Sequence, residues 1–203
     1  MLKFTEFIAE DMSVSSLTIW DIDDTLFRTT TKVFVVKGDR RVRTLTPAEF
    51  NVYKLKSGEE FDFSEFRSAE VFNATARPVD TVFKTAKKIL SKFRDSPHKK
   101  IIIITARSDL DDKKLFLATF KKYGFDINRV HVERAGNRDL PGPAAKAQIT
   151  SEYLQKGNYT VARMFDDAVK NLQSFLALKK EFPKVNFEAF LIHENGSITR
   201  YGV

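Results

Sequence analysis

The chain has 203 residues, of which 42% are hydrophobic and 30% charged, which suits one domain, residues 1–203, with a substantial core. It contains no cysteine, no apolar run as long as a membrane span and no secretory leader, so we expect a cytoplasmic protein without disulfides or thiolate metal sites. The net charge of +7 fits either a lysine-rich surface or a polyanionic partner such as nucleic acid.

The first predicted strand ends in a pair of acids. Residues 1–16 are predicted to form a short helix or tail, and the apolar run that follows predicts a buried strand over residues 17–22. Asp21 and Asp23 are two residues apart, so an extended backbone points both to one face. Two carboxylates this close are costly unless a cation lies between them or one is protonated. A hard divalent ion, Mg²⁺, is the expected solution.

Residues 28–77 lack alternating strands and helices, so we predict a small cap inserted after the first strand. Residues 33–36 and 42–45 flank a glycine turn and predict a hairpin. Thr46 and Glu49 predict the capped start of a short helix. Six basic residues and one acid, Asp39, lie between residues 28 and 43. The six are Arg28, Lys32, Lys37, Arg40, Arg41 and Arg43. This excess predicts an anionic substrate, with Arg41 and Arg43 as candidate contacts.

Strands and amphipathic helices alternate from residue 78 onwards. Helices are predicted to begin at Pro78 and at Ser108, where Asp111 completes a capping box. The predicted strands are residues 101–104, 130–133, 159–165 and 187–192, and Asn195-Gly196 turns the chain into an antiparallel edge at residues 198–201. The pattern predicts an α/β fold, a mostly parallel five-stranded sheet flanked by helices.

Four polar residues stand at the predicted carboxyl ends of strands, where α/β sheets bind ligands. They are Asp21, Asp23, Thr105 and Asp166. The first acids also begin like a Ca²⁺ loop, but Leu26 and Lys32 occupy the positions that require glycine and glutamate.

Simpler structural roles remain open for the other candidates. Thr105 could cap its strand, and Asp166 with Asp167 could cap the following helix. Lys146 could be a solvated lysine at a helix start, although a cation is unfavourable there unless a carboxylate lies nearby.

These residues together resemble the motifs of the haloacid dehalogenase (HAD) superfamily of phosphohydrolases. The matching residues are Asp21, Asp23 and Thr25, then Thr105, then Lys146, then Asp166 and Asp167. The resemblance implies a Rossmann-like HAD fold and a Mg²⁺-dependent phosphomonoesterase that forms an aspartyl-phosphate.

The resemblance also implies roles for individual residues. Asp21 would be the nucleophile and Asp23 the general acid and base, with Thr105 bonding a phosphoryl oxygen and Lys146 neutralising charge. The metal ligands would be Asp21, Asp166 and the backbone carbonyl of Asp23, with Asp167 either a partner of a ligand or the direct ligand itself if the strand is offset by one residue. Thr25 and Arg107 are candidate substrate contacts, and Arg107 could instead pair with an acid of the cap.

The open cap beside a basic hairpin is similar to polynucleotide 3′-phosphatase domains and to phage-encoded HAD-type proteins. This similarity implies a nucleotide or a nucleic-acid terminal (3′) phosphate as substrate, met in the host cytoplasm if the protein is phage-encoded. A small-metabolite phosphatase and a catalytically silent HAD-fold binding protein are the alternatives.

Overall fold

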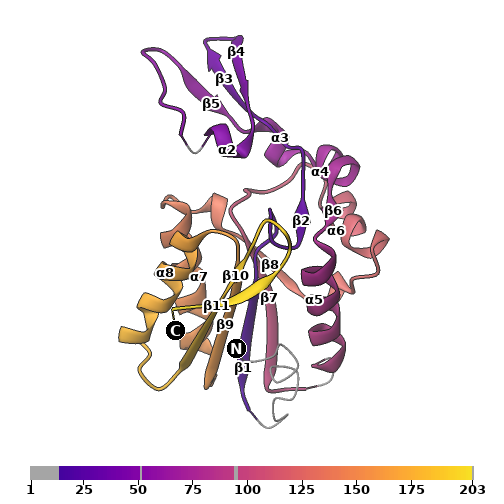
Figure 1. Cartoon of the computed structure of the whole chain (residues 1–203), viewed down its shortest axis with the longest axis vertical. Helices are drawn as coiled ribbons and strands as arrows, with labels where there is room; N and C mark the ends of the chain where they lie inside the picture. The colour runs from indigo at the N-terminus through magenta and orange to yellow at the C-terminus, as the bar shows by residue number, and fades with distance from the viewer. Residues whose placement is uncertain (1–13, 51, 94–95, 203) are drawn as a thin grey trace.

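A six-stranded sheet forms the centre of the computed structural model, which describes residues 14–50, 52–93 and 96–202 (Figure 1). Its strands are β1 (Ser16–Trp20), β7 (Lys99–Thr105), β8 (His131–Arg134), β9 (Val161–Asp166), β10 (Asn186–Ile192) and β11 (Ile198–Tyr201), in the order β11-β10-β9-β1-β7-β8. The first five are parallel, as predicted, and β11 adds the predicted antiparallel edge as a sixth strand.

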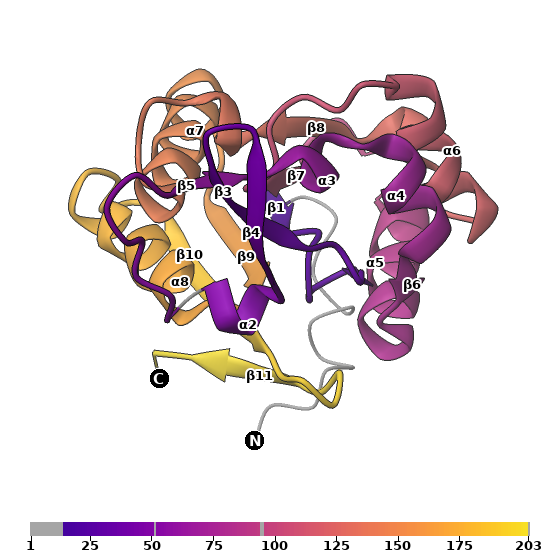
Figure 2. The same cartoon turned by 90° about the horizontal axis from the view of Figure 1, so that it is seen from above.

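Helices cover both faces of this sheet (Figure 2). α5 (Asp80–Lys92) and α6 (Lys113–Lys122) pack on one face, and α7 (Gly142–Lys156) and α8 (Val169–Ala177) on the other. Strand β7 shows why: Ile101 and Ile103 enter one apolar cluster, while Ile102 and Ile104 enter the other. The described residues of this part of the chain also form three 3₁₀ turns, η1 (Ile127–Arg129), η2 (Ala135–Asn137) and η3 (Leu178–Lys180). Among the described helices, none is long and apolar enough to cross a bilayer.

The order of the strands reverses beside β1. The chain runs from β1 to β7 and β8 on one side, and then returns to place β9 and β10 on the other side. β1 pairs with β7 through one edge and with β9 through the other. Where the connections that follow two adjacent parallel strands run in opposite directions, a crevice forms at the carboxyl ends of those strands, and open α/β sheets bind ligands there.

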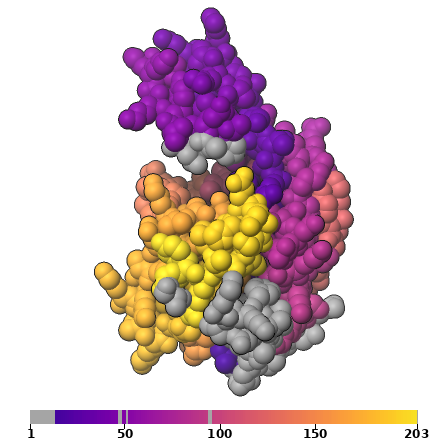
Figure 3. Space-filling model, viewed as in Figure 1, coloured from indigo at the N-terminus to yellow at the C-terminus, as the bar shows by residue number. Residues whose placement is uncertain are grey.

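Residues 27–78, which lie between the loop that carries Asp21 and Asp23 and the start of α5, build the cap. Its described residues form the three-stranded sheet β4-β3-β5 and three short helices, and it stands over the carboxyl ends of the central strands (Figure 1). The space-filling view shows a hollow between the cap and the central sheet (Figure 3). Its elements are β2 (Phe27–Arg28), β3 (Val33–Lys37), β4 (Arg40–Leu45), α2 (Pro47–Phe50), β5 (Glu60–Asp62), α3 (Ser64–Arg67), α4 (Ala69–Thr75) and β6 (Arg77–Pro78). The predicted hairpin is therefore present as β3 and β4. The capped start of α2 is confirmed, since Thr46 Oγ1 accepts from the Glu49 amide at 3.2 Å and the Glu49 carboxylate accepts from the Thr46 amide at 2.7 Å.

A register shift in this hairpin separates the two candidate arginines. Arg43 lies opposite Val35 and Arg41 opposite Val36, with the irregularity between those two residues of β3. Val35 and Val36 are neighbours on β3 and therefore point to opposite faces of the cap sheet. The arginines paired with them do the same, because the irregularity lets two residues of β4 that are two positions apart pair with adjacent residues of β3. The Arg41 guanidinium lies 3.2 Å from the centre of the Phe34 ring, and that of Arg43 lies 5.4 Å from the Tyr53 ring.

Two predicted helix starts are wrong, and both errors involve contacts with or near the cap. Pro78 pairs with Phe27 in the β2–β6 ladder, so α5 begins two residues later, at Asp80. Ser108 does not begin a helix; α6 begins at Lys113, with Asp112 as its cap. Asp111, expected to complete a capping box, instead accepts a hydrogen bond from the backbone of Ala69 in the cap. Residues 1–13 of the predicted N-terminal helix or tail lie outside the described residues.

Candidate active site

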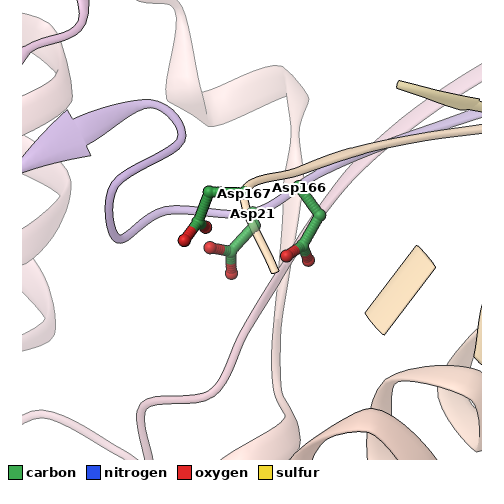
Figure 4. A group of neighbouring side chains, drawn as sticks. All are labelled: Asp21, Asp166 and Asp167. Atoms are coloured by element: carbon green, nitrogen blue, oxygen red, sulfur yellow. The ribbon is translucent and has the colours of Figure 1, made fainter. Parts of the chain in front are cut away.

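Three aspartates meet at the crevice between β1 and β9. Asp21 directly follows β1, Asp166 is the last residue of β9, and Asp167 comes next. Each offers a carboxylate oxygen within 4.8 Å of the others, and Figure 4 shows the Asp21 carboxyl group between those of its two neighbours. Asp21 and Asp166 are buried, at 6% and 1% exposure. The strand ends thus gather acids that lie far apart in the sequence.

Lys146 links two of these acids. Its Nζ atom donates to Asp21 Oδ1 at 2.6 Å and to Asp166 Oδ2 at 2.7 Å. It projects from the second turn of α7 and is only 1% exposed, so it is not the solvated lysine of the simpler interpretation. The expectation that a nearby carboxylate accounts for its position is confirmed. Within the described part of the chain, no hydrogen bond reaches the other oxygen of Asp21.

Burial and mutual repulsion dominate the electrostatics of this cluster. Burial raises the pKa of Asp21 well above its usual value, opposed by Lys146 and reinforced by Asp166 and Asp167. Burial and the neighbouring Asp166 raise the pKa of Asp167 to about 6. For Lys146 burial acts to lower the pKa, but Asp166 and Asp21 outweigh it, and the pKa rises above its ordinary value. One lysine therefore faces three acids, and a divalent cation would supply the missing positive charge.

Hydrogen bonds fix the second and third acids. Asp166 Oδ1 accepts from the Ala168 amide at 2.9 Å and from the Asn171 side chain at 2.8 Å. The helix-capping role that had been left open for Asp166 thus exists alongside its contact with Lys146. Thr25 Oγ1 donates to Asp167 Oδ1 and accepts from the Asp167 amide, both at 3.1 Å. Thr25 is fully buried, and its contact with substrate stays a prediction.

Asp23 lies apart from the three clustered carboxylates and is held by Arg107. Arg107 Nε donates to Asp23 Oδ2 at 2.9 Å, and Nη2 donates to Oδ1 at 2.7 Å. The carboxyl groups that could bind a metal together are those of Asp21, Asp166 and Asp167. Ligation through the Asp23 carbonyl stays a prediction. Arg107 was expected to contact phosphate or an acid of the cap, whereas the structure gives it an acid of the first loop.

The neighbouring strand ends carry the predicted Thr105 and also Arg134, which the sequence analysis missed. Thr105 is fully buried, and its hydroxyl accepts from the Arg107 amide at 3.2 Å, a contact of the strand-capping kind. Arg134 lies opposite Thr105 at the end of β8. Its Nε and Nη1 atoms are buried and lack hydrogen-bond partners among the described residues, while its guanidinium lies 4.5 Å from the centre of the Phe116 ring. The signal available for Arg134 was its place directly after the strand predicted over residues 130–133, and for Asn171 it was its place five residues after Asp166.

Arg41 and Arg43 lie on β4 of the cap and are exposed. Within the described residues they make no hydrogen bond or ion pair with the acids at the strand ends. Their contact with substrate stays a prediction.

Comparison with known proteins identifies the fold. No protein-family model and no curated protein matches the chain. Among solved structures it is similar to the HAD domain of effector protein Lem4 from Legionella pneumophila, with a TM-score of 0.52 and 13% identity over 89% of this chain and 88% of that one. The likeness confirms the predicted Rossmann-like HAD fold.

Proposed function

We propose that the protein is a Mg²⁺-dependent phosphomonoesterase that works through an aspartyl-phosphate on Asp21. The observation that carries the proposal is the shared contact of Asp21 and Asp166 with Lys146 Nζ, at the point where the strand order reverses. The HAD fold of the similar structure supports it.

The donor set suits magnesium. Carboxylate oxygens are the ligands that Mg²⁺ prefers, and Asp21, Asp166 and Asp167 offer three of them within 4.8 Å of one another. The ion would be held by these acids, and by the Asp23 carbonyl, and would neutralise charge on the transferring phosphoryl group. Lys146 already holds one oxygen of Asp21, which leaves the other oxygen free to attack phosphorus.

Different residues of the chain then carry out the separate steps of the reaction. Asp21 attacks phosphorus, the bond to the leaving oxygen breaks, and Asp23 gives that oxygen a proton. Asp23 next removes a proton from the water that hydrolyses the aspartyl-phosphate, which regenerates Asp21. Thr105 and Lys146 bind or balance negative charge in both steps.

For the substrate we propose a nucleotide or the terminal 3′-phosphate of a nucleic acid. The exposed arginines of the cap and the net charge of +7 support an extended anion. The separation of Arg41 and Arg43 onto opposite faces of the cap sheet favours the second candidate, a small phosphorylated metabolite, because a short ligand needs only one of them.

The test is a phosphatase screen with Mg²⁺, and with chelator as control, on an aryl phosphate, mononucleotides, and 3′- and 5′-phosphorylated oligonucleotides. Asp21→Asn should lose at least about 10³-fold in kcat while keeping its fold by circular dichroism. The exposed Asp139→Asn should retain activity. Wild-type rates in Asp21→Asn would rule out Asp21 as nucleophile, and no hydrolysis by the wild type would favour a silent binding protein.

A further inference from the structure

Arg107 joins the first acidic loop to the cap. Besides its two bonds to Asp23, its Nη1 donates to the Phe66 carbonyl of α3 at 3.0 Å, and Nη2 reaches Thr31 Oγ1 at 3.3 Å. The guanidinium lies 4.8 Å from the centre of the Phe66 ring and 5.0 Å from that of Phe72. One side chain therefore contacts the candidate acid–base group and three residues of the insertion.

The burial of Arg107 limits what it can do. Its side chain is fully buried, whereas the Asp23 side chain is 26% exposed. A buried arginine needs its charge compensated, and Asp23 is the acid that pairs with it among the described residues. If Arg107 moved away from Asp23 to bind a substrate phosphate, it would also lose its hydrogen bonds to Phe66 and Thr31. The geometry suits holding a neighbour in place better than reaching for a ligand.

The loop that carries Arg107 is itself fastened to the cap helices. The Asp111 amide donates to the Arg67 carbonyl at 2.9 Å, and Asp111 Oδ1 accepts from the Ala69 amide at 2.7 Å. On its other side this loop packs against Gly136, where a Cβ atom would come within 2.4 Å of the Ala106 carbonyl oxygen. The position of Arg107 thus depends on both the cap and the turn after β8.

We infer that Arg107 is a positioning residue that aims the carboxylate of Asp23, and that the cap, through Phe66 and Thr31, holds Arg107 in position. The inference rests on the proposed function, because the role of Asp23 comes from that proposal. It makes the cap a structural part of the acid–base step in addition to a surface for substrate.

Leaving-group dependence tests it. When Asp21 attacks, an alkyl leaving oxygen needs the proton of Asp23, whereas an activated aryl oxide departs as the anion. Arg107→Met should lower kcat/KM for an alkyl phosphate by about 100-fold or more and for an aryl phosphate by only a few fold. Arg107→Lys keeps the positive charge but cannot donate from two nitrogens to both oxygens of Asp23, so its kcat/KM for the alkyl phosphate should lie between those of wild type and Arg107→Met. Millimolar guanidinium should partly restore the kcat/KM of Arg107→Met for the alkyl phosphate.

Two further variants keep the test decisive if Arg107→Met does not fold. Thr31→Val and Asp111→Asn leave Arg107 and Asp23 intact, and each should show the same preference for the aryl ester at about 3- to 10-fold. Arg67→Gln is the matched control, because its side chain is exposed and only its carbonyl contacts Asp111. Equal kcat/KM losses on both esters in an active enzyme would overturn the inference alone; an inactive wild type would overturn the proposed function and the inference with it.

Discussion

The strand-end site and the cap both gather charge, but they handle it in opposite ways. At the strand ends, buried acids surround a buried lysine, and every group is held by hydrogen bonds shorter than about 3.2 Å. In the cap, exposed arginines lie over aromatic rings. A buried charge without compensation is costly, whereas an exposed one is screened by water. The site is therefore geometrically constrained, while the cap is free to be adapted to a substrate.

Removing the buried lysine should produce the largest effect. Lys146→Met leaves Asp21 and Asp166 buried without their cation, which costs about 3–5 kcal/mol in the free energy of unfolding. For a chain of this size the midpoint temperature of thermal unfolding should fall by about 6–20 °C. Turnover should be lost as well. Lys156→Met in the same helix is the control, because Lys156 is exposed. A midpoint within a degree of wild type would mean that the acids are not ionised in the native state.

Replacing Asp167 should stabilise the metal-free protein, and the effect should depend on pH. The folded pKa of Asp167, about 6, lies above the ordinary aspartate pKa of 3.8, so between these pH values the native state binds more protons than the unfolded state. Stability from this group is thus present at low pH and is lost as pH rises through 6. In chelator, the free energy of unfolding of Asp167→Asn should rise relative to wild type between pH 4 and 6 and stay about 1–3 kcal/mol higher above pH 6. The weaker hydrogen bonds of the asparagine to Thr25 should reduce this difference.

Denaturation midpoints of the two proteins from pH 4 to 8 test this, with the exposed Asp139→Asn as control. Saturating Mg²⁺ should reverse the order, because it stabilises only a chain that keeps its ligands. A variant less stable than wild type at every pH in chelator would show that the Thr25 contacts outweigh the repulsion between the acids.

The strand-end residues could be predicted because periodicity marks where a buried strand stops. Asp21, Thr105 and Asp166 each close an apolar run, and parallel strands bring such ends together. The contacts of Arg107 could not be predicted in the same way. Its partners Asp23, Thr31 and Phe66 come from the first loop and the cap, where strands and helices do not alternate regularly and the sequence therefore does not show how the chain folds back. The same holds for Ser108, because its predicted helix gave way to contacts between Asp111 and the cap.

The smallest predicted effect concerns the cap arginines taken one at a time. Because Arg41 and Arg43 project from opposite faces, only the one on the face that meets the substrate should matter. Arg43→Glu and Arg41→Glu should therefore differ: one should lower kcat/KM for a phosphorylated oligonucleotide by about 3- to 10-fold at low salt, and the other should change it little. Neither should alter turnover of an aryl phosphate, because this substrate carries no further phosphates for an arginine to attract. Equal losses for both arginines on the oligonucleotide would indicate a general attraction to positive charge, and equal losses on both substrates would remove the cap sheet from substrate recognition.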